Sequence, residues 1–274
     1  MKLESPYRFR ERILLLGGGG AGKTTATLSM IRASGLPADV IDLDYSMAWD
    51  RALDTDFEDS RDQVKIHSVQ PYWEDFINTM EGIVDTYGDD PDRWLVVDSI
   101  SPTWEEVQAW YVQLAIGSDM GKFLAELRRD SDSVKDYNAS IVENMNWPAV
   151  KKEYARTWRA IMSWKGHLVL TAEAASIKGE RDADQLALYG QVGYKPVGEK
   201  RLHHVTSTTL FLEHGRRGWL FTTVKDRNRD EVEKKQVEDL DDGGMATSYL
   251  REVAGWKLAR RANRLAVEGD DDDE

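Results

Sequence analysis

A run of glycines followed by a lysine and two threonines lies near the start of the chain, and these residue types suit phosphate binding. The run has the spacing G-x-x-x-x-G-K-T and consists of Gly17, Gly18, Gly19, Gly20, Ala21, Gly22, Lys23, Thr24 and Thr25. Glycine allows positive φ angles and lets backbone N–H groups approach phosphate oxygens closely. In such a loop the lysine reaches the β- and γ-phosphates, and the first threonine hydroxyl binds Mg²⁺. We therefore expect a nucleoside triphosphate and Mg²⁺ to bind here, with Thr24 as a metal ligand.

A short apolar run that ends in an aspartate supplies the second candidate. Residues 94–97 are Trp, Leu, Val and Val, and Asp98 follows them. After a phosphate-binding loop, an aspartate at the end of a buried strand holds Mg²⁺, usually through water. The alternative is an ordinary strand whose last residue caps the following turn. The order of the two motifs favours Asp98 as a metal-binding residue.

Strands and helices must hold these residues, and the hydrophobic pattern predicts both. Apolar or alternating runs predict strands at residues 13–16, 39–44, 63–69, 94–98 and 166–171. Helical spacing predicts helices at residues 25–33, 72–87, 103–116 and 147–164. Two β-prone runs, 206–212 and 219–224, flank residues 214–218 and predict a hairpin. Strands that alternate with helices indicate an α/β fold with a mainly parallel sheet, helices on both faces and a C-terminal hairpin.

The chain divides into a core over residues 1–230 and a C-terminal segment over residues 231–274. Within the core, residues 117–146 are polar and are predicted to be an insertion. Residues 174–204 are rich in glycine and charge, so we predict a mobile loop there. The C-terminal segment is expected to hold a helix at residues 247–267 and an acidic tail after it.

Composition and charge restrict the possible functions. The chain has no cysteine, which excludes disulfides, zinc–thiolate sites and thiol catalysis and fits a reducing, cytoplasmic setting. We expect neither a signal peptide nor a membrane span, and therefore no membrane partner. The net charge of -13 argues against nucleic acid as a partner, but the charge is unevenly distributed. Six acidic residues fall within 268–274, whereas residues 178–229 carry ten Lys or Arg and six Asp or Glu.

Four stretches together resemble the RecA-like P-loop ATPases, a group of AAA-type ATP-binding proteins. They are residues 17–25, 40–44, 95–100 and 224–229. The resemblance implies ATP hydrolysis, with Asp44 orienting the attacking water and with Lys225 and Arg227 reaching the ATP of a neighbouring subunit. Glu173 falls where the family has a polar sensor residue, commonly Gln. Asp44 replaces the glutamate of the family pattern, so Asp42 and Glu173 remain alternatives for the water-orienting role.

The alternatives for these residues are structural. Asp44 is also typical of a carboxylate at a strand end, and Lys225 and Arg227 are typical of a charged, solvated hairpin exit. Arg229 is a further candidate for the contact with a neighbour.

In size and layout the chain is most similar to phage single-strand annealing and recombination ATPases. That resemblance implies a phage-encoded, DNA-stimulated ATPase that acts on single-stranded DNA. It also implies self-association as a ring or filament with ATP between subunits. In residues 174–204, basic side chains could pair with DNA phosphates and a tyrosine could stack on a base; these are Lys178, Arg181, Lys195, Lys200, Arg201, Tyr189 and Tyr194.

Two other functions fit the same motifs. The chain could be a nucleotide-gated module that binds a protein partner, or a subunit of a DnaB-like helicase or packaging motor. A switch GTPase fits less well, because Asp98 is followed by Ser99-Ile100-Ser101 and not by the D-x-x-G pattern of that class.

Overall fold

The architecture comes from a computed structural model, which describes residues 10–44, 47–70, 72–180, 182–215, 218–229, 236–238, 249–250 and 253–256. The described strands are β1 (Arg12–Gly17), β2 (Ala38–Asp42), β3 (Val64–Ser68), β4 (Trp94–Asp98), β5 (His167–Ser176), β6 (Tyr194–Pro196), β7 (Thr208–Gly215), β8 (Gly218–Asp226) and β9 (Gln236–Glu238). The described helices are α1 (Lys23–Ser34), α2 (Ala48–Asp54), η1 (Glu58–Gln63), α3 (Trp73–Tyr87), α4 (Thr103–Ile116), α5 (Met120–Arg129), α6 (Val134–Asn144), α7 (Trp147–Ser163), α8 (Ala183–Tyr189) and α9 (Leu202–Val205).

One sheet organises these elements. Its strand order is β3-β2-β4-β5-β1-β7-β8-β9, with β6 paired to β5 outside that path. Along this order, the six strands β3, β2, β4, β5, β1 and β7 run parallel to one another. The strands β7, β8 and β9 pair in antiparallel fashion. Parallel strands end at the same edge, so the carboxyl ends of β1, β2, β4 and β5 lie together.

Helices cover both faces of the sheet, as the alternating side chains of β1 illustrate. Leu14 and Leu16 belong to a buried cluster with α3, α4 and α7, whereas Ile13 and Leu15 belong to a second cluster with α1 and α2. In a strand, successive side chains point to opposite faces, so each face acquires its own core. The predicted fold class is confirmed: the chain has an α/β fold with a mainly parallel sheet, helices on both faces and a hairpin formed by β7 and β8.

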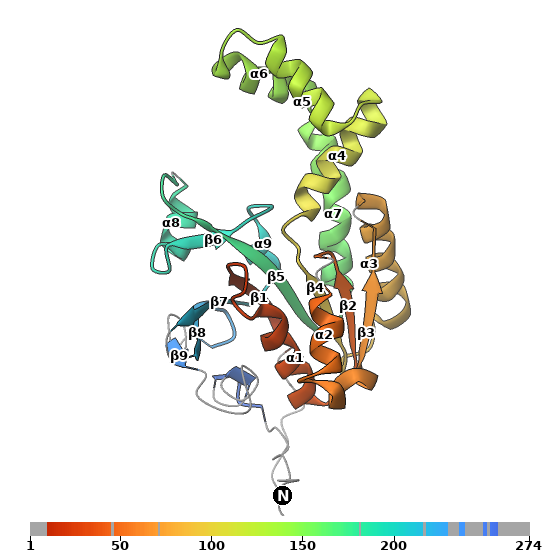
Figure 1. Cartoon of the computed structure of the whole chain (residues 1–274), viewed down its shortest axis with the longest axis vertical. Coiled ribbons are helices and arrows are strands. Elements are labelled where there is room, and N and C mark those ends of the chain that lie inside the picture. The colour runs from red at the N-terminus through yellow and green to blue at the C-terminus, as the bar shows by residue number, and fades with distance from the viewer. Residues whose placement is uncertain are drawn as a thin grey trace, which may run out of the picture.

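Residues 117–146, which the sequence predicts to be an insertion, contain two helices, α5 and α6. Figure 1 shows them at the far end of α4 and α7, away from the sheet. Asp119 caps the start of α5, where its side chain accepts the N–H of Lys122, and Ser133 caps the start of α6 by accepting the N–H of Asp136. The polar residues that marked this segment as an insertion therefore include two helix caps.

The prediction of a loop at residues 174–204 is wrong in its secondary structure. The strand β5 continues to Ser176 and pairs with β6, and α8 and α9 follow the two arms of this ribbon. In Figure 1 the ribbon and α8 extend beyond the main sheet. The sequence shows no clear pattern for β6, α8 and α9 because each is short, and β6 has only three residues. The predicted helix at 247–267 and the acidic tail lie outside the described residues, apart from 249–250 and 253–256.

In the part of the chain that the structure describes, no helix is both long enough and apolar enough to cross a lipid bilayer.

Charged side chains form a hydrogen-bonded cluster at the amino end of the sheet. Asp39 of β2 is fully buried and accepts hydrogen bonds from His67 Nε2 and Arg93 Nη1, each at 2.8 Å. Burial by itself would raise the pKa of Asp39, but the hydrogen bonds from His67 and Arg93 outweigh burial and lower it. The ionised carboxylate therefore ties β2 to β3 and to the start of β4.

We expect Asp39→Ala to lower the free energy of unfolding by about 1.5–3 kcal/mol at pH 7, because Arg93 and His67 lose a charged acceptor. A group with a lowered folded pKa stabilises the fold above its unfolded pKa of about 3.9 and loses this effect as the pH falls through the folded value. The difference between variant and wild type should therefore shrink in acid. Urea unfolding at several pH values measures both effects.

The matched control is Asp90→Ala, because Asp90 pairs with the same Arg93 but is 38% exposed. Its expected cost is at most about 1 kcal/mol. Equal losses for the two variants would contradict the role given to Asp39.

Candidate functional site

The glycine-rich loop joins β1 to α1 at the carboxyl edge of the sheet. Gly20 and Gly22 have φ angles of 73° and 83°, which favour glycine over any residue with a side chain. Lys23 Nζ donates to the carbonyl oxygens of Gly17 and Gly18 at 3.0 and 3.1 Å. The Lys23 ammonium group thus lies against its own loop, where the negative charge of a bound phosphate would be.

Asp98 lies at the end of β4 and faces this loop. Thr24 Oγ1 donates to Asp98 Oδ2 at 3.0 Å, although the two residues are 74 positions apart. Asp98 is only 5% exposed, and it accepts two further hydrogen bonds, from Trp49 Nε1 at 2.9 Å and from the Thr171 hydroxyl. A hydroxyl and a carboxylate in contact are oxygen donors of the kind that Mg²⁺ prefers.

Two of these partners of Asp98 were absent from the sequence-based interpretation. Thr171 is the first polar residue after the apolar run 168–170 of β5, so its position beside β4 was a usable signal. Trp49 belongs to α2, which has seven residues and too little periodicity to predict. Nothing in the sequence indicated that its indole would reach Asp98.

The candidates for orienting water occupy the same edge. Asp42 forms a register pair with Asp98 across β2 and β4 and is 8% exposed. Burial raises the pKa of Asp42, and the nearby carboxylates of Asp98 and Asp44 raise it further, against a hydrogen bond from the Asp44 N–H. Asp44 itself is exposed and lies two residues beyond β2.

A polar cavity of about 260 Å³ brings Asp44 and Glu173 together. Glu173 is exposed and forms a register pair with Gly17, the last residue of β1. Ser101 lines the same cavity, and its hydroxyl accepts the N–H of Glu173 at 2.9 Å. The roles of Asp42, Asp44 and Glu173 stay predictions, but all three lie at the edge that carries the loop.

Lys225 and Arg227 lie at the other end of the sheet. Asp226 pairs with Thr208, which pairs with Ile13 at the start of β1, whereas the loop follows Gly17. Lys225 is buried and its ammonium donates to the carbonyl oxygens of His203 and Thr206; burial lowers its pKa to about 8. Arg227 is exposed, with one long hydrogen bond of 3.4 Å to the His204 carbonyl.

Arg229 is committed to a structural ion pair. Its Nη2 lies 2.6 Å from Oε1 of Glu11, and it also pairs with Asp226 at 3.1 Å. Glu11 is fully buried, so the arginine is needed to compensate its charge.

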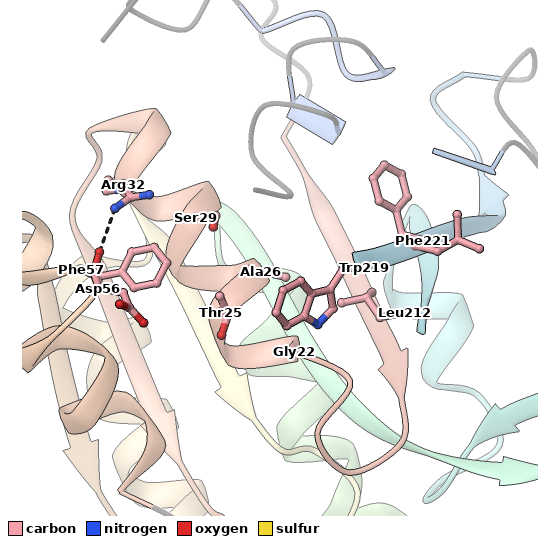
Figure 2. Close-up of a pocket in the computed structure, with 11 residues that line it drawn as sticks. Gly22, Thr25, Ala26, Ser29, Arg32, Asp56, Phe57, Leu212, Trp219 and Phe221 are labelled. Carbon is pink, nitrogen blue, oxygen red and sulfur yellow. Dashed lines mark hydrogen bonds between the residues drawn. The ribbon is translucent and has the colours of Figure 1, made fainter. Parts of the chain in front are cut away.

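An apolar pocket of about 310 Å³ opens beside the loop (Figure 2). Its floor is one stripe of α1, with Thr25, Ala26 and Ser29, and Phe57 and Trp219 flank the stripe on opposite sides. The Trp219 indole packs so closely on the loop that a Cβ at Gly22 would lie 2.3 Å from Nε1. A flat ring next to the phosphate-binding loop would be enclosed by aromatic and aliphatic surface here.

The candidate DNA-binding residues of 174–204 are differently placed. Tyr189 is fully buried and therefore cannot stack on a base, whereas Tyr194 is 42% exposed and stacks on Phe211. Lys195 and Arg201 form ion pairs with Glu180 and Glu199. Lys178 and Lys200 are exposed. Arg181 lies outside the described residues.

Comparisons with known proteins give distant likenesses only. No protein-family model matches the chain, and no curated protein matches it. Among solved structures, the RadB recombinase is similar with a TM-score of 0.46 and 12% identity, over 83% of this chain and 86% of that one.

Two further solved structures are similar over 74% of this chain. An ATPase from the type III secretion system of pathogenic bacteria has a TM-score of 0.42 and 13% identity, and 51% of it is covered. The ATP synthase subunit NeqB from Nanoarcheaum equitans has a TM-score of 0.41 and 8% identity, with 47% covered. Likenesses this distant carry no argument about what the chain binds or does.

We expect Gly22→Ala to destabilise the protein more than Gly20→Ala. Both substitutions place a side chain at positive φ, which costs about 1–2 kcal/mol, but only the Gly22 side chain meets Trp219, since nothing lies within 4 Å at Gly20. The crowding adds about 1 kcal/mol or more. Urea unfolding measures the difference, and a Trp219→Ala background should abolish it. Equal costs in the wild-type background would contradict this packing.

Proposed function

We propose that this protein is a RecA-like ATPase that binds ATP with Mg²⁺ and hydrolyses it. The observation that carries the proposal is the 3.0 Å hydrogen bond from Thr24 to Asp98, which joins the two motifs that metal-dependent phosphoryl transfer requires. A glycine-rich turn without a ligand needs no buried carboxylate in contact with its threonine.

Thr24 and Asp98 would hold Mg²⁺. The fit rests on their chemistry, because Mg²⁺ needs only one or two protein oxygens and retains several waters. When bound, Mg²⁺ would offset the negative charge of the phosphates. The Thr24 hydroxyl is able to turn its hydrogen toward Asp98 and leave its oxygen free for the metal, which is the orientation of the present hydrogen bond.

Lys23 would exchange its two carbonyl partners for phosphate oxygens. The carbonyl oxygens of Gly17 and Gly18 that accept from Lys23 are neutral and lie on a partly exposed loop. A triphosphate oxygen is charged and therefore forms a stronger hydrogen bond with the ammonium group. The attacking water would be oriented from the cavity lined by Asp44 and Glu173, with Asp44 as the first candidate. Asp42 remains the alternative, since it forms a register pair with Asp98 at the same edge of the sheet.

The nucleoside would occupy the pocket beside the loop. Thr25, the last residue of the loop motif, and Ala26 after it line that pocket, so a nucleotide that leaves the loop on this side reaches Trp219. Stacking on an indole ring favours a base without reading its hydrogen-bonding edge.

We expect Lys23→Ala to lower ATP turnover by about 10²–10³-fold, because the transition state loses one charged donor. The matched control is Lys65→Ala, which removes the same charge from an exposed position on β3 and should leave turnover unchanged. Turnover is measured with and without single-stranded DNA at several salt concentrations. If Lys23→Ala turned over at the wild-type rate while folded, the ATPase assignment would be wrong.

The same experiment tests the finer proposal that single-stranded DNA is the partner. The proposal draws on the exposed Lys178, which follows β5, on the exposed Lys200, which follows β6, and on the phage-type resemblance of the sequence. DNA should stimulate hydrolysis, and its affinity should fall as salt rises. Slow turnover that DNA does not change, with no salt-sensitive DNA binding, would favour a nucleotide-gated protein-binding module.

Self-association with ATP between subunits is the second finer proposal. Arg227 is exposed at the sheet end opposite its own loop, so it is available only to the nucleotide of another subunit. Lys225 is held by two backbone carbonyls in the single chain, and would have to leave them to take part.

We expect Arg227→Ala to reduce hydrolysis by about 10³-fold or more, as loss of an arginine finger does. Mixing Arg227→Ala with Lys23→Ala should then restore part of the activity, because one interface in the mixed assembly joins an intact loop to an intact arginine. Steady-state ATPase rates of the mixture against each variant alone measure this. A mixture no more active than its components would reject a shared site.

A further inference from the structure

We propose that Trp49 is a positioning residue for Asp98, whose indole N–H fixes the carboxylate in the orientation that meets Thr24 and Mg²⁺. This inference rests on the proposed function of the site. Trp49 belongs to no phosphate-binding motif, and its role follows from the hydrogen bond that its indole makes from α2 to Asp98 at the end of β4.

The contact is short and shielded from water. Trp49 Nε1 lies 2.9 Å from Asp98 Oδ2, and the two residues are 1% and 5% exposed. A hydrogen bond to a buried carboxylate is stronger than one in water, because no solvent competes for either partner. Oδ2 is also the oxygen that accepts the Thr24 hydroxyl, so both contacts meet at one atom.

The three donors on Asp98 differ in how firmly they fix it. The hydroxyls of Thr24 and Thr171 rotate, and each oxygen can also accept a hydrogen bond. An indole N–H is a donor only, and its direction is fixed by the ring. The two threonine hydroxyls can rotate away from the carboxylate and bond elsewhere. The Trp49 N–H cannot, so it fixes the direction of its hydrogen bond to Asp98.

The ring is itself held in place by packing. Trp49 belongs to the buried cluster on the α1 face of the sheet, together with Leu53 and Phe57. Met47, the residue before α2, has a φ of 52°, a left-handed conformation that is costly for any residue except glycine. Trp49 follows Met47 by two residues and lies in the first turn of α2, within hydrogen-bond distance of Asp98.

A second tryptophan provides a matched control. Trp94 at the start of β4 is also fully buried, and its Nε1 donates to Ser34 Oγ at 3.0 Å, at the opposite end of the strand from Asp98. Trp94→Phe and Trp49→Phe each remove one buried indole N–H and keep an aromatic ring. They differ in which acceptor loses its donor.

The first measurement is the Mg²⁺ dependence of ATP hydrolysis. For Trp49→Phe we expect the half-saturating Mg²⁺ concentration to rise by about 10–100-fold, the usual effect of removing a partner of a metal ligand. Binding of ATP in EDTA should stay as in the wild type, because the loop is intact. Trp94→Phe should show the wild-type Mg²⁺ dependence.

The second measurement needs no metal and no activity. The indole ¹⁵N–¹H resonance of Trp49 is identified in wild-type protein by its absence from Trp49→Phe. Asp98→Ala should shift this resonance upfield and leave that of Trp94 in place, since only Trp49 loses its acceptor. If Trp49→Phe fails to fold, the same resonance is identified by elimination, from single Phe substitutions of the other tryptophans.

The outcomes separate this inference from the proposed function. If the wild type hydrolyses ATP and Trp49→Phe responds to Mg²⁺ like Trp94→Phe, the positioning role is overturned and the ATPase assignment stands. If the wild type hydrolyses no ATP, the proposed function fails, and the resonance shift still decides whether Trp49 holds Asp98. An unmoved Trp49 resonance in Asp98→Ala would overturn the inference in either case.

Discussion

A buried carboxylate at the end of β4 is the constraint on which this site depends. Asp98 is almost inaccessible to water, and an ionised group in that position is tolerated only when hydrogen bonds replace its hydration. Thr24, Trp49 and Thr171 supply these bonds from α1, α2 and β5. Three elements that are distant in sequence therefore converge on one side chain, and the phosphate-binding loop is fixed relative to β4 as a result.

The two ends of the sheet use charge in different ways. At the amino end, Asp39 and Glu11 are fully buried and each is neutralised by arginine, through Arg93 and Arg229. At the carboxyl end the acidic side chains of Asp44 and Glu173 are exposed around an open cavity, and Lys23 of the loop donates to the carbonyl oxygens of Gly17 and Gly18. Charges at the first end stabilise the fold, and those at the second are available to a charged ligand.

Much of the core could be predicted from sequence, because long periodic runs and the loop motif determine it. The strands at 94–98 and 13–16 and the helix at 103–116 emerged close to their predicted bounds, since apolar periodicity reports which face is buried. Short elements, including α2, β6 and α8, could not be predicted, because so few residues show no hydrophobic periodicity. The burial of Tyr189 and Lys225 could not be read from residue type, as it depends on which strands become neighbours. Trp49 escaped for the same reason, since only the packing of α2 brings it to Asp98.

A structure of the protein with Mg²⁺ and a non-hydrolysable ATP analogue tests the central claim most directly. The account predicts the triphosphate in the loop at residues 17–25, the metal between the Thr24 hydroxyl and Asp98, and the base beside Trp219. An analogue bound elsewhere, or an Asp98 carboxylate turned away from the metal, would contradict it.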